Sequence, residues 1–162
     1  MRFKLLLLFA LLMAISTFVI GCDSELNVKG KVLELVNAPS TEKGSVYITN
    51  ISTYQTHNIH ISETPPQDIN LQPIPSANIS FWYITEKGGI IPVRGGPPTP
   101  ESNIISSDYL GNFKELWVVG PGKSNMKIIV QKDGYYTVER IFPFDGGDPG
   151  TFDFTVLLVP KP

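Results

Sequence analysis

Cysteine is almost absent from this sequence of 162 residues, which contains only Cys22. A single thiol cannot form an internal disulfide, so an exported domain would have to be stabilised by its core alone. Charge is also scarce, because charged residues make up 17% of the chain and the net charge is −2. Without a cluster of lysine and arginine, the chain is a poor candidate for binding nucleic acid, and we expect partners of neutral or mixed charge.

The residue patterns that support catalysis are missing as well. The only two histidines, His57 and His60, are three residues apart on an expected strand and would project to opposite faces, which disfavours a shared metal. No serine lies in a Gly-x-Ser-x-Gly pattern. Asp145 and Asp148 have glycines between them, but their spacing is more typical of a turn than of a calcium loop. We therefore expect no catalytic site, no metal and no cofactor.

The first part of the chain has the pattern of an export signal. Arg2 and Lys4 precede an apolar run over residues 5–20, which is slightly too short for a typical spanning helix. Residues 19–22, Val-Ile-Gly-Cys, resemble the lipobox of bacterial lipoproteins. In that family the chain is cleaved before the cysteine. The cysteine is then acylated, with palmitate among the acyl groups, and anchors the protein to a membrane. The alternatives are an uncleaved anchor or a secretory signal with a chance cysteine.

The resemblance to lipoproteins divides the chain into three parts. Residues 1–21 are expected to be a lipoprotein signal peptide and residues 22–25 a lipidated tether that begins at Cys22. Residues 26–162 are expected to form one domain in the bacterial cell envelope, outside the cytoplasm. Several acyl chains on Cys22 would make the attachment stable, since each buried methylene contributes about 0.8 kcal/mol.

The sequence of this domain predicts an all-β fold. Glycine and proline each occur fourteen times, and no segment after residue 25 keeps helical periodicity. Alternating apolar residues instead predict seven to nine short strands, which suit a two-sheet sandwich with one apolar face per sheet. The expected strands cover residues 26–36, 45–51, 56–62, 77–83, 90–94, 113–119, 126–131, 135–142 and 152–159.

Short motifs along the domain identify a second resemblance. They are residues 28–32 (VKGKV), 75–79 (PSANI), 107–113 (SDYLGNF) and 128–130 (IIV), the last leading to Gly134-Tyr135. These motifs look like the carboxypeptidase regulatory-like domain, whose fold is a prealbumin-like (transthyretin-like) sandwich. The resemblance implies an accessory module that binds or assembles with other components and does not catalyse a reaction. The segments 33–74 and 85–103 are longer than the family pattern, and such surface insertions often carry specificity.

Two enzyme families share this sandwich, and neither matches the sequence. Intradiol dioxygenases need tyrosine and histidine ligands in a His-x-His arrangement, which is missing here. Hydroxyisourate hydrolases end in Tyr-Arg-Gly-Ser, whereas this chain ends in Val-Pro-Lys-Pro. An unrecognised hydrolase of the transthyretin-like fold remains an alternative hypothesis.

Aromatic side chains are the best candidates for ligand binding. Trp82, Tyr83, Tyr135 and Tyr136, together with Trp117, could form a flat platform that stacks on a sugar ring or on a partner's side chain. Trp82 is expected to be exposed, because Phe81 and Tyr83 occupy the inner face of its strand. The competing interpretation places most of these rings in the core. The sequence thus predicts a membrane-anchored binding module whose partner is an envelope protein or a polysaccharide.

Overall fold

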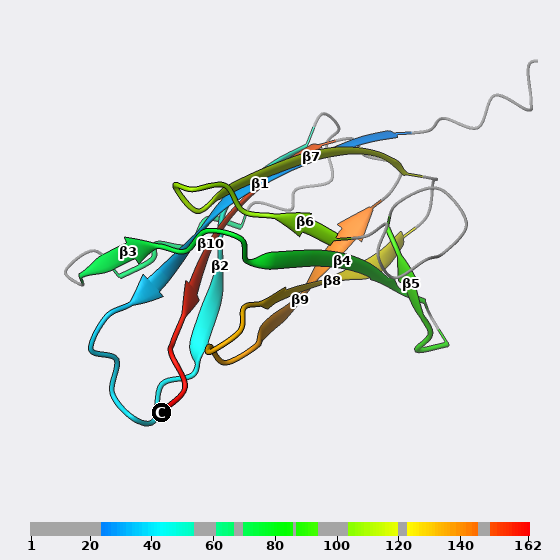
Figure 1. Cartoon of the computed structure of the whole chain (residues 1–162). Helices are drawn as coiled ribbons and strands as arrows, with labels where there is room; N and C mark the ends of the chain where they lie inside the picture. The colour runs from blue at the N-terminus through cyan, green and yellow to red at the C-terminus, as the bar shows by residue number, and fades with distance from the viewer. Residues whose placement is uncertain are drawn as a thin grey trace, which may run out of the picture.

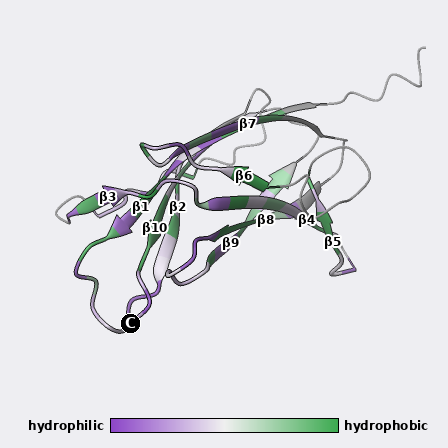
Figure 2. Ribbon diagram, viewed as in Figure 1, coloured by the Kyte–Doolittle hydropathy of each residue, from purple (hydrophilic) through white to green (hydrophobic). Residues whose placement is uncertain are grey.

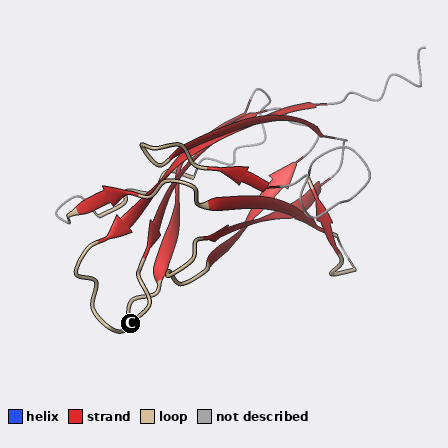
Figure 3. Ribbon diagram, in the orientation of Figure 1, coloured by secondary structure: helices blue, strands red, loops and turns tan. Residues whose placement is uncertain are grey.

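The computed structural model describes residues 24–53, 61–66, 70–85, 87–93, 104–119, 123–145 and 150–162. These residues form ten β-strands and no helix (Figure 3). The strands are β1 (Ser24–Leu35), β2 (Gly44–Thr53), β3 (Leu71–Pro73), β4 (Asn78–Ile84), β5 (Ile90–Pro92), β6 (Ile104–Ser106), β7 (Asn112–Val119), β8 (Lys123–Gln131), β9 (Val138–Asp145) and β10 (Gly150–Leu158). The predicted all-β fold is confirmed.

The strands form two five-stranded sheets that lie as two layers (Figure 1). In sheet A, β1 is parallel to β10, and β2 pairs with the other edge of β10. The second edge of β1 is shared by β7 and β3, both antiparallel to it. In sheet B the order is β5, β4, β8, β9, and β6 shares with β5 one edge of β4. This arrangement is the two-sheet sandwich that the alternating pattern predicted.

The faces of the strands follow the alternation of the sequence. In β1, Val28 and Val32 are fully buried, whereas Lys29 and Lys31 are exposed. In β8, Met126, Ile128 and Val130 are also fully buried. Figure 2 shows the corresponding alternation of hydrophilic and hydrophobic residues along the strands. Each sheet therefore buries one face against the other, as the hydrophobic effect requires.

Phenylalanine rings join the two sheets across the core. Phe81 of β4 packs against Phe154 of β10, with ring centroids 5.6 Å apart. Phe142 of β9 contacts both Phe152 and Phe154, at 5.7 and 5.4 Å. These tilted pairs are a favourable geometry for aromatic rings. They hold β4 and β9 of sheet B over β10 of sheet A.

Gly30 of β1 lies where its two neighbours in sheet A, β10 and β7, leave no room for a side chain. A Cβ atom built at this position would lie 2.5 Å from the carbonyl oxygen of Phe154 and 2.6 Å from the ring of Phe113. Glycine is the residue that permits such a close approach within a strand. The Phe113 ring is the group that occupies the space.

The consecutive strands β7 and β8 belong to different sheets. β7 pairs with β1 in sheet A, whereas β8 pairs with β4 and β9 in sheet B. The turn before β7 is organised by Asp108, whose Oδ1 accepts hydrogen bonds from the amides of Leu110 and Asn112, both at 2.8 Å. Gly111 completes this turn with a φ of 77°, a conformation that favours glycine.

The structure differs from the predicted strands in the start of β9 and in two additional short strands. β9 begins at Val138, because Tyr135 and its neighbours form a turn and not the start of a strand. β3 and β6 are additional strands of three residues each. The predicted strand 45–51 is confirmed as β2, which forms the edge of sheet A and buries Val46, Ile48 and Ile51, so the long segment 33–74 builds part of the sandwich. Most of the predicted strand 56–62 lies outside the described residues.

Candidate functional site

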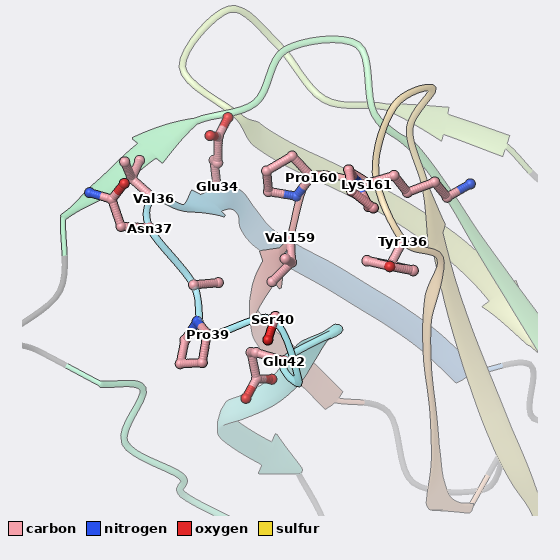
Figure 4. A pocket seen from close by; sticks show the side chains of 12 residues that line it. Glu34, Val36, Asn37, Pro39, Ser40, Glu42, Tyr136, Val159, Pro160 and Lys161 are labelled. Atoms are coloured by element: carbon pink, nitrogen blue, oxygen red, sulfur yellow. The ribbon is translucent and has the colours of Figure 1, made fainter.

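A hollow of about 430 Å³ lies where β1 and β10 end (Figure 4). Because the two strands are parallel, their carboxyl ends meet at this end of sheet A. In Figure 4, Tyr136 and Pro39 lie on opposite sides of the hollow, with Val159 between them. The lining residues are Glu34, Val36, Asn37, Ala38, Pro39, Ser40, Glu42, Tyr136, Val159, Pro160, Lys161 and Pro162.

One wall of the hollow is the connection between β1 and β2. Asn37 adopts a left-handed conformation with φ of 60°, which asparagine tolerates better than most residues. The amide of Glu42 donates to the carbonyl of Pro39 at 2.8 Å and closes the turn. The Glu42 carboxylate accepts a hydrogen bond from the amide of Gly44 at 3.3 Å. These local bonds fix a short loop with a polar edge.

The opposite wall joins the turn after β8 to the last residues of the chain. The amide of Tyr136 donates to the carbonyl of Val159 at 3.0 Å, and the amide of Lys161 donates to the carbonyl of Gly134 at 2.7 Å. These two bonds extend sheet-like pairing beyond the strands, with a bridge between Tyr135 and Pro160. The half-buried Tyr136 ring is thereby held at the hollow.

Of the charged groups around the hollow, Glu34 accepts a hydrogen bond, whereas Lys161 is exposed to solvent. The hydroxyl of Tyr135 donates to Glu34 Oε2 at 2.6 Å. This hydrogen bond, with desolvation and the negative charge of Glu34, raises the pKa of Tyr135 to about 12. Lys161 is exposed and supplies a positive charge at the same rim. The hollow therefore presents an aromatic ring, three prolines, and charged hydrogen-bonding groups of both signs.

The four predicted aromatic residues are not brought together into one platform. Trp82 and Tyr83 project from opposite faces of β4. Trp82 is on the outer face but half-buried, and its Nε1 donates to Ser80 Oγ at 3.0 Å. Tyr135 is engaged with Glu34 and packs against the core. Only Tyr136 lines the hollow, and the side chain of Trp117 lies outside the described residues.

Tyr83 is a partly buried residue that packs against the core. Its ring packs against Phe144 with centroids 5.9 Å apart. Its buried hydroxyl has no hydrogen-bond partner in the part of the chain that the structure describes. Burial raises the pKa of Tyr83, so the phenol stays neutral.

A second hollow, of about 440 Å³, lies at the open edge between β2 and β9. Its central feature is the ion pair between Glu63 and Arg140. Arg140 Nη1 donates to Glu63 Oε2 at 2.6 Å and to the carbonyl of Val46 at 2.7 Å. The Arg140 guanidinium lowers the pKa of Glu63 through its hydrogen bond, and desolvation opposes the shift. Because the carboxylate of Glu63 and the guanidinium of Arg140 already pair with each other, we assign this hollow a structural role.

Several predicted positions lie outside the described residues. They are Cys22, His57, His60 and Asp148, and the side chain of Asp145 is also outside the description. Within the described ranges, no three histidine, cysteine, aspartate or glutamate side chains are grouped so that they could hold a metal ion. The same ranges contain no helix with the length and hydropathy needed to span a membrane.

The sequence interpretation missed most of the hollow around Tyr136. Glu34 and Glu42 come from the connection after β1, whereas Val159 and Lys161 follow β10. More than a hundred positions separate these groups in the sequence, and only the parallel pairing of β1 with β10 brings them together. The signal that was available is compositional, namely the prolines and polar residues that follow each strand.

Comparisons with known proteins give a remote likeness in structure alone. No protein-family model matches the chain, and no curated protein sequence matches it. 3-Chlorocatechol 1,2-dioxygenase from Rhodococcus opacus 1CP shares 11% identity at a TM-score of 0.46, over 88% of this chain and 62% of its own. Catechol 1,2-dioxygenase from Acinetobacter sp. ADP1, inhibited by bound mercury, shares 9% identity at a TM-score of 0.47, over 89% of this chain. This chain spans only 55% of the Acinetobacter enzyme. Such low identity and TM-scores transfer neither a family nor an activity.

Proposed function

We propose that the protein is a lipid-anchored lipoprotein of the bacterial envelope that works outside the cytoplasm as a non-catalytic binding or assembly module. The anchoring half of the proposal is supported by the basic residues Arg2 and Lys4, the apolar run 5–20 and the lipobox-like residues 19–22. The start of β1 at Ser24 also supports it, because a folded domain then follows Cys22 almost directly. The carboxypeptidase regulatory-like resemblance belongs to the same proposal.

The proposal of a binding function is supported by the hollow at the carboxyl end of β1. β1 contains twelve residues, so it spans about 36 Å at roughly 3.3 Å per residue. With Cys22 acylated, the start of β1 lies at the membrane and the hollow faces away from it. A site in that position can reach components of the envelope beyond the anchoring membrane.

A glycan is the ligand class that the lining favours. The ring of Tyr136 offers a face on which a sugar can stack, while Asn37, Ser40 and Glu42 offer hydrogen-bonding groups at the opposite side. Sites of this kind combine an apolar ring with a few polar groups that orient the ligand. A protein partner is the second candidate, supported by the three prolines that line the hollow, which present rigid apolar surface.

Affinity electrophoresis tests the glycan assignment. A soluble form that begins at residue 22 and carries Cys22→Ser would migrate through gels that contain a panel of polysaccharides. We expect one polysaccharide to retard the protein, and the Tyr136→Ala variant to lose that retardation. Trp82→Ala is the matched control, because Trp82 lies on the outer face of sheet B, away from the hollow.

The two variants separate the possible outcomes. Retardation that is lost in Trp82→Ala and kept in Tyr136→Ala would contradict the assignment and locate binding on sheet B. No retardation by any polysaccharide would reject the glycan and leave the protein partner, which cross-linking in intact envelopes would then identify. Metabolic labelling with palmitate tests the anchor separately, and Cys22→Ser must abolish that labelling.

A further inference from the structure

The start of β1 and the tip of the β4–β5 hairpin lie at the same end of the sandwich. Ser24 is paired with Val119 at the end of β7. Four residues later the chain enters β8 at Lys123, and Asn125 of β8 is paired with Ile84 at the end of β4. The hairpin from β4 to β5 therefore begins close to the end of the sandwich where β1 starts. Figure 1 shows both features on the right-hand side of the molecule, opposite the C-terminus.

Two neighbouring isoleucines are left uncovered on this hairpin. Ile90 is 55% exposed and Ile91 is 50% exposed, although consecutive residues of a strand project to opposite faces. Ile90 is paired with Ile84 and Ile91 with Tyr83. A strand in a sandwich normally buries one of its two faces, as Val93 does just after β5, at 4% exposure. The tip of the hairpin thus presents apolar side chains in both directions.

The distance to the proposed anchor indicates what covers these isoleucines. Ser24 is two residues from Cys22, and two residues of extended chain span at most about 7 Å. If Cys22 is acylated, the start of β1 is held at the bilayer surface, and the same end of sheet B is held near it. A bilayer interface accepts apolar side chains from both faces of a hairpin tip, and a nearby lysine can keep its charge among the headgroups. Lys87, in the turn of this hairpin, is exposed.

We propose that the tip of the β4–β5 hairpin, with Ile90 and Ile91, inserts into the interface of the membrane to which Cys22 is attached. The inference rests on the proposed acylation of Cys22. The acyl chains supply the attachment, and the hairpin supplies a second contact that fixes the orientation of the sandwich. With two contacts at one end, the hollow at the other end is held away from the membrane.

Depth-dependent quenching tests the contact in the intact, acylated protein. Acylated Cys22 has no free thiol, so a cysteine introduced elsewhere is the only site for a fluorescent label. The label would be attached to Ile91→Cys or Ile90→Cys, and the protein reconstituted into vesicles of phosphatidylethanolamine and phosphatidylglycerol with brominated acyl chains. Leu110→Cys is the matched control, because Leu110 is an aliphatic residue with a similar exposure of 46%. It lies in the turn whose Gly111 contacts Val32, near the opposite end of β1.

We expect the labels at residues 90 and 91 to shift to shorter wavelength and to lose intensity in brominated vesicles, and the label at residue 110 to do neither. Equal, water-like emission at all three positions in an acylated protein would overturn the inference and leave the anchor intact. A blue shift at residues 90 and 91 without quenching by brominated lipid would also overturn it, because a protein and not lipid would cover them. Mass spectrometry that finds no acyl chain on Cys22 would overturn the anchor and the inference together.

Discussion

Arg140 joins the edge of sheet B to residue Glu63, which lies beside the edge of sheet A. The Arg140 guanidinium makes two hydrogen bonds with the Glu63 carboxylate and a third with the carbonyl of Val46. Glu63 is itself tied to β2, because its amide donates to the carbonyl of Ile48 and its carboxylate accepts from the Ile48 amide. Arg140 follows Val138 on the inner face of β9, where an unpaired charge would be costly. The pair thus closes one open side of the sandwich.

Replacing Glu63 with glutamine should destabilise the protein in a pH-dependent way. The lowered pKa of Glu63 means that its charged form stabilises the fold above the unfolded value of about 4.3. This contribution is lost as the pH falls through the lowered pKa. We expect Glu63→Gln to reduce the free energy of unfolding by about 1–3 kcal/mol at neutral pH. The difference should vanish in acid, and urea unfolding of both proteins over a pH series would measure it.

Glu139→Gln is the control for that experiment. Glu139 also pairs with a cation, Lys127, at 2.7 Å, but its side chain is 57% exposed. An exposed ion pair contributes at most about 1 kcal/mol. Equal losses in the two variants would show that Glu63 and Arg140 are no more than a surface pair.

Tyr135→Phe should remove stability that depends on a protonated phenol. The pKa of Tyr135 is raised to about 12 by its hydrogen bond to Glu34, so the bond stabilises the fold fully below the unfolded value of about 10. The contribution is lost as the pH rises from there to the raised pKa. We expect the variant to lose about 1 kcal/mol at neutral pH and to match the parent at high pH. Tyr109→Phe, at an 81% exposed residue, should unfold like the parent throughout.

Gly30→Ala should be among the most damaging single-atom additions in the domain. The new methyl group would lie 2.5 Å from a backbone oxygen of β10 and 2.6 Å from the ring of Phe113. We expect a loss of about 3 kcal/mol or more, measured by thermal or urea unfolding. In Gly88→Ala the methyl group would meet nothing within 4 Å, and only the left-handed backbone would cost about 1–2 kcal/mol. A smaller loss at Gly30 than at Gly88 would contradict the packing described for β1.

Ser107→Ala tests the buried hydroxyl that precedes the turn of Asp108. Ser107 Oγ donates to the carbonyl of Ile74 at 2.8 Å and accepts from the amide of Ala77 at 2.9 Å. Since the variant leaves both backbone groups without this partner, we expect a loss of about 1–3 kcal/mol in urea unfolding. The neighbouring Ser106 is exposed, so Ser106→Ala should change stability by less than about 0.5 kcal/mol.

Structural features that depend only on residues adjacent in the sequence, such as the buried face of a strand, could be predicted from the sequence alone. The alternation of Val28 and Val32 with lysines predicted which face of β1 is buried, because side chains of a strand alternate with a period of two residues. The same alternation predicts Ala77, Ile79 and Phe81 in the core and Trp82 on the outer face. The lipobox-like residues and the carboxypeptidase regulatory-like motifs are local as well, and what they imply remains a prediction.

The tertiary structure decided which strands became neighbours. No local pattern distinguishes β7 from β8, yet they entered different sheets, because sheet membership depends on distant partners such as β1 and β4. The pair of Glu63 and Arg140 spans 77 positions of the sequence, and each side chain alone looks like an ordinary surface charge. The hollow at Tyr136 arose in the same way, since parallel pairing of the first and last strands brought their ends together. Alternation along a strand determined its buried face, whereas hydrogen bonding and packing between distant segments determined where its functional groups meet.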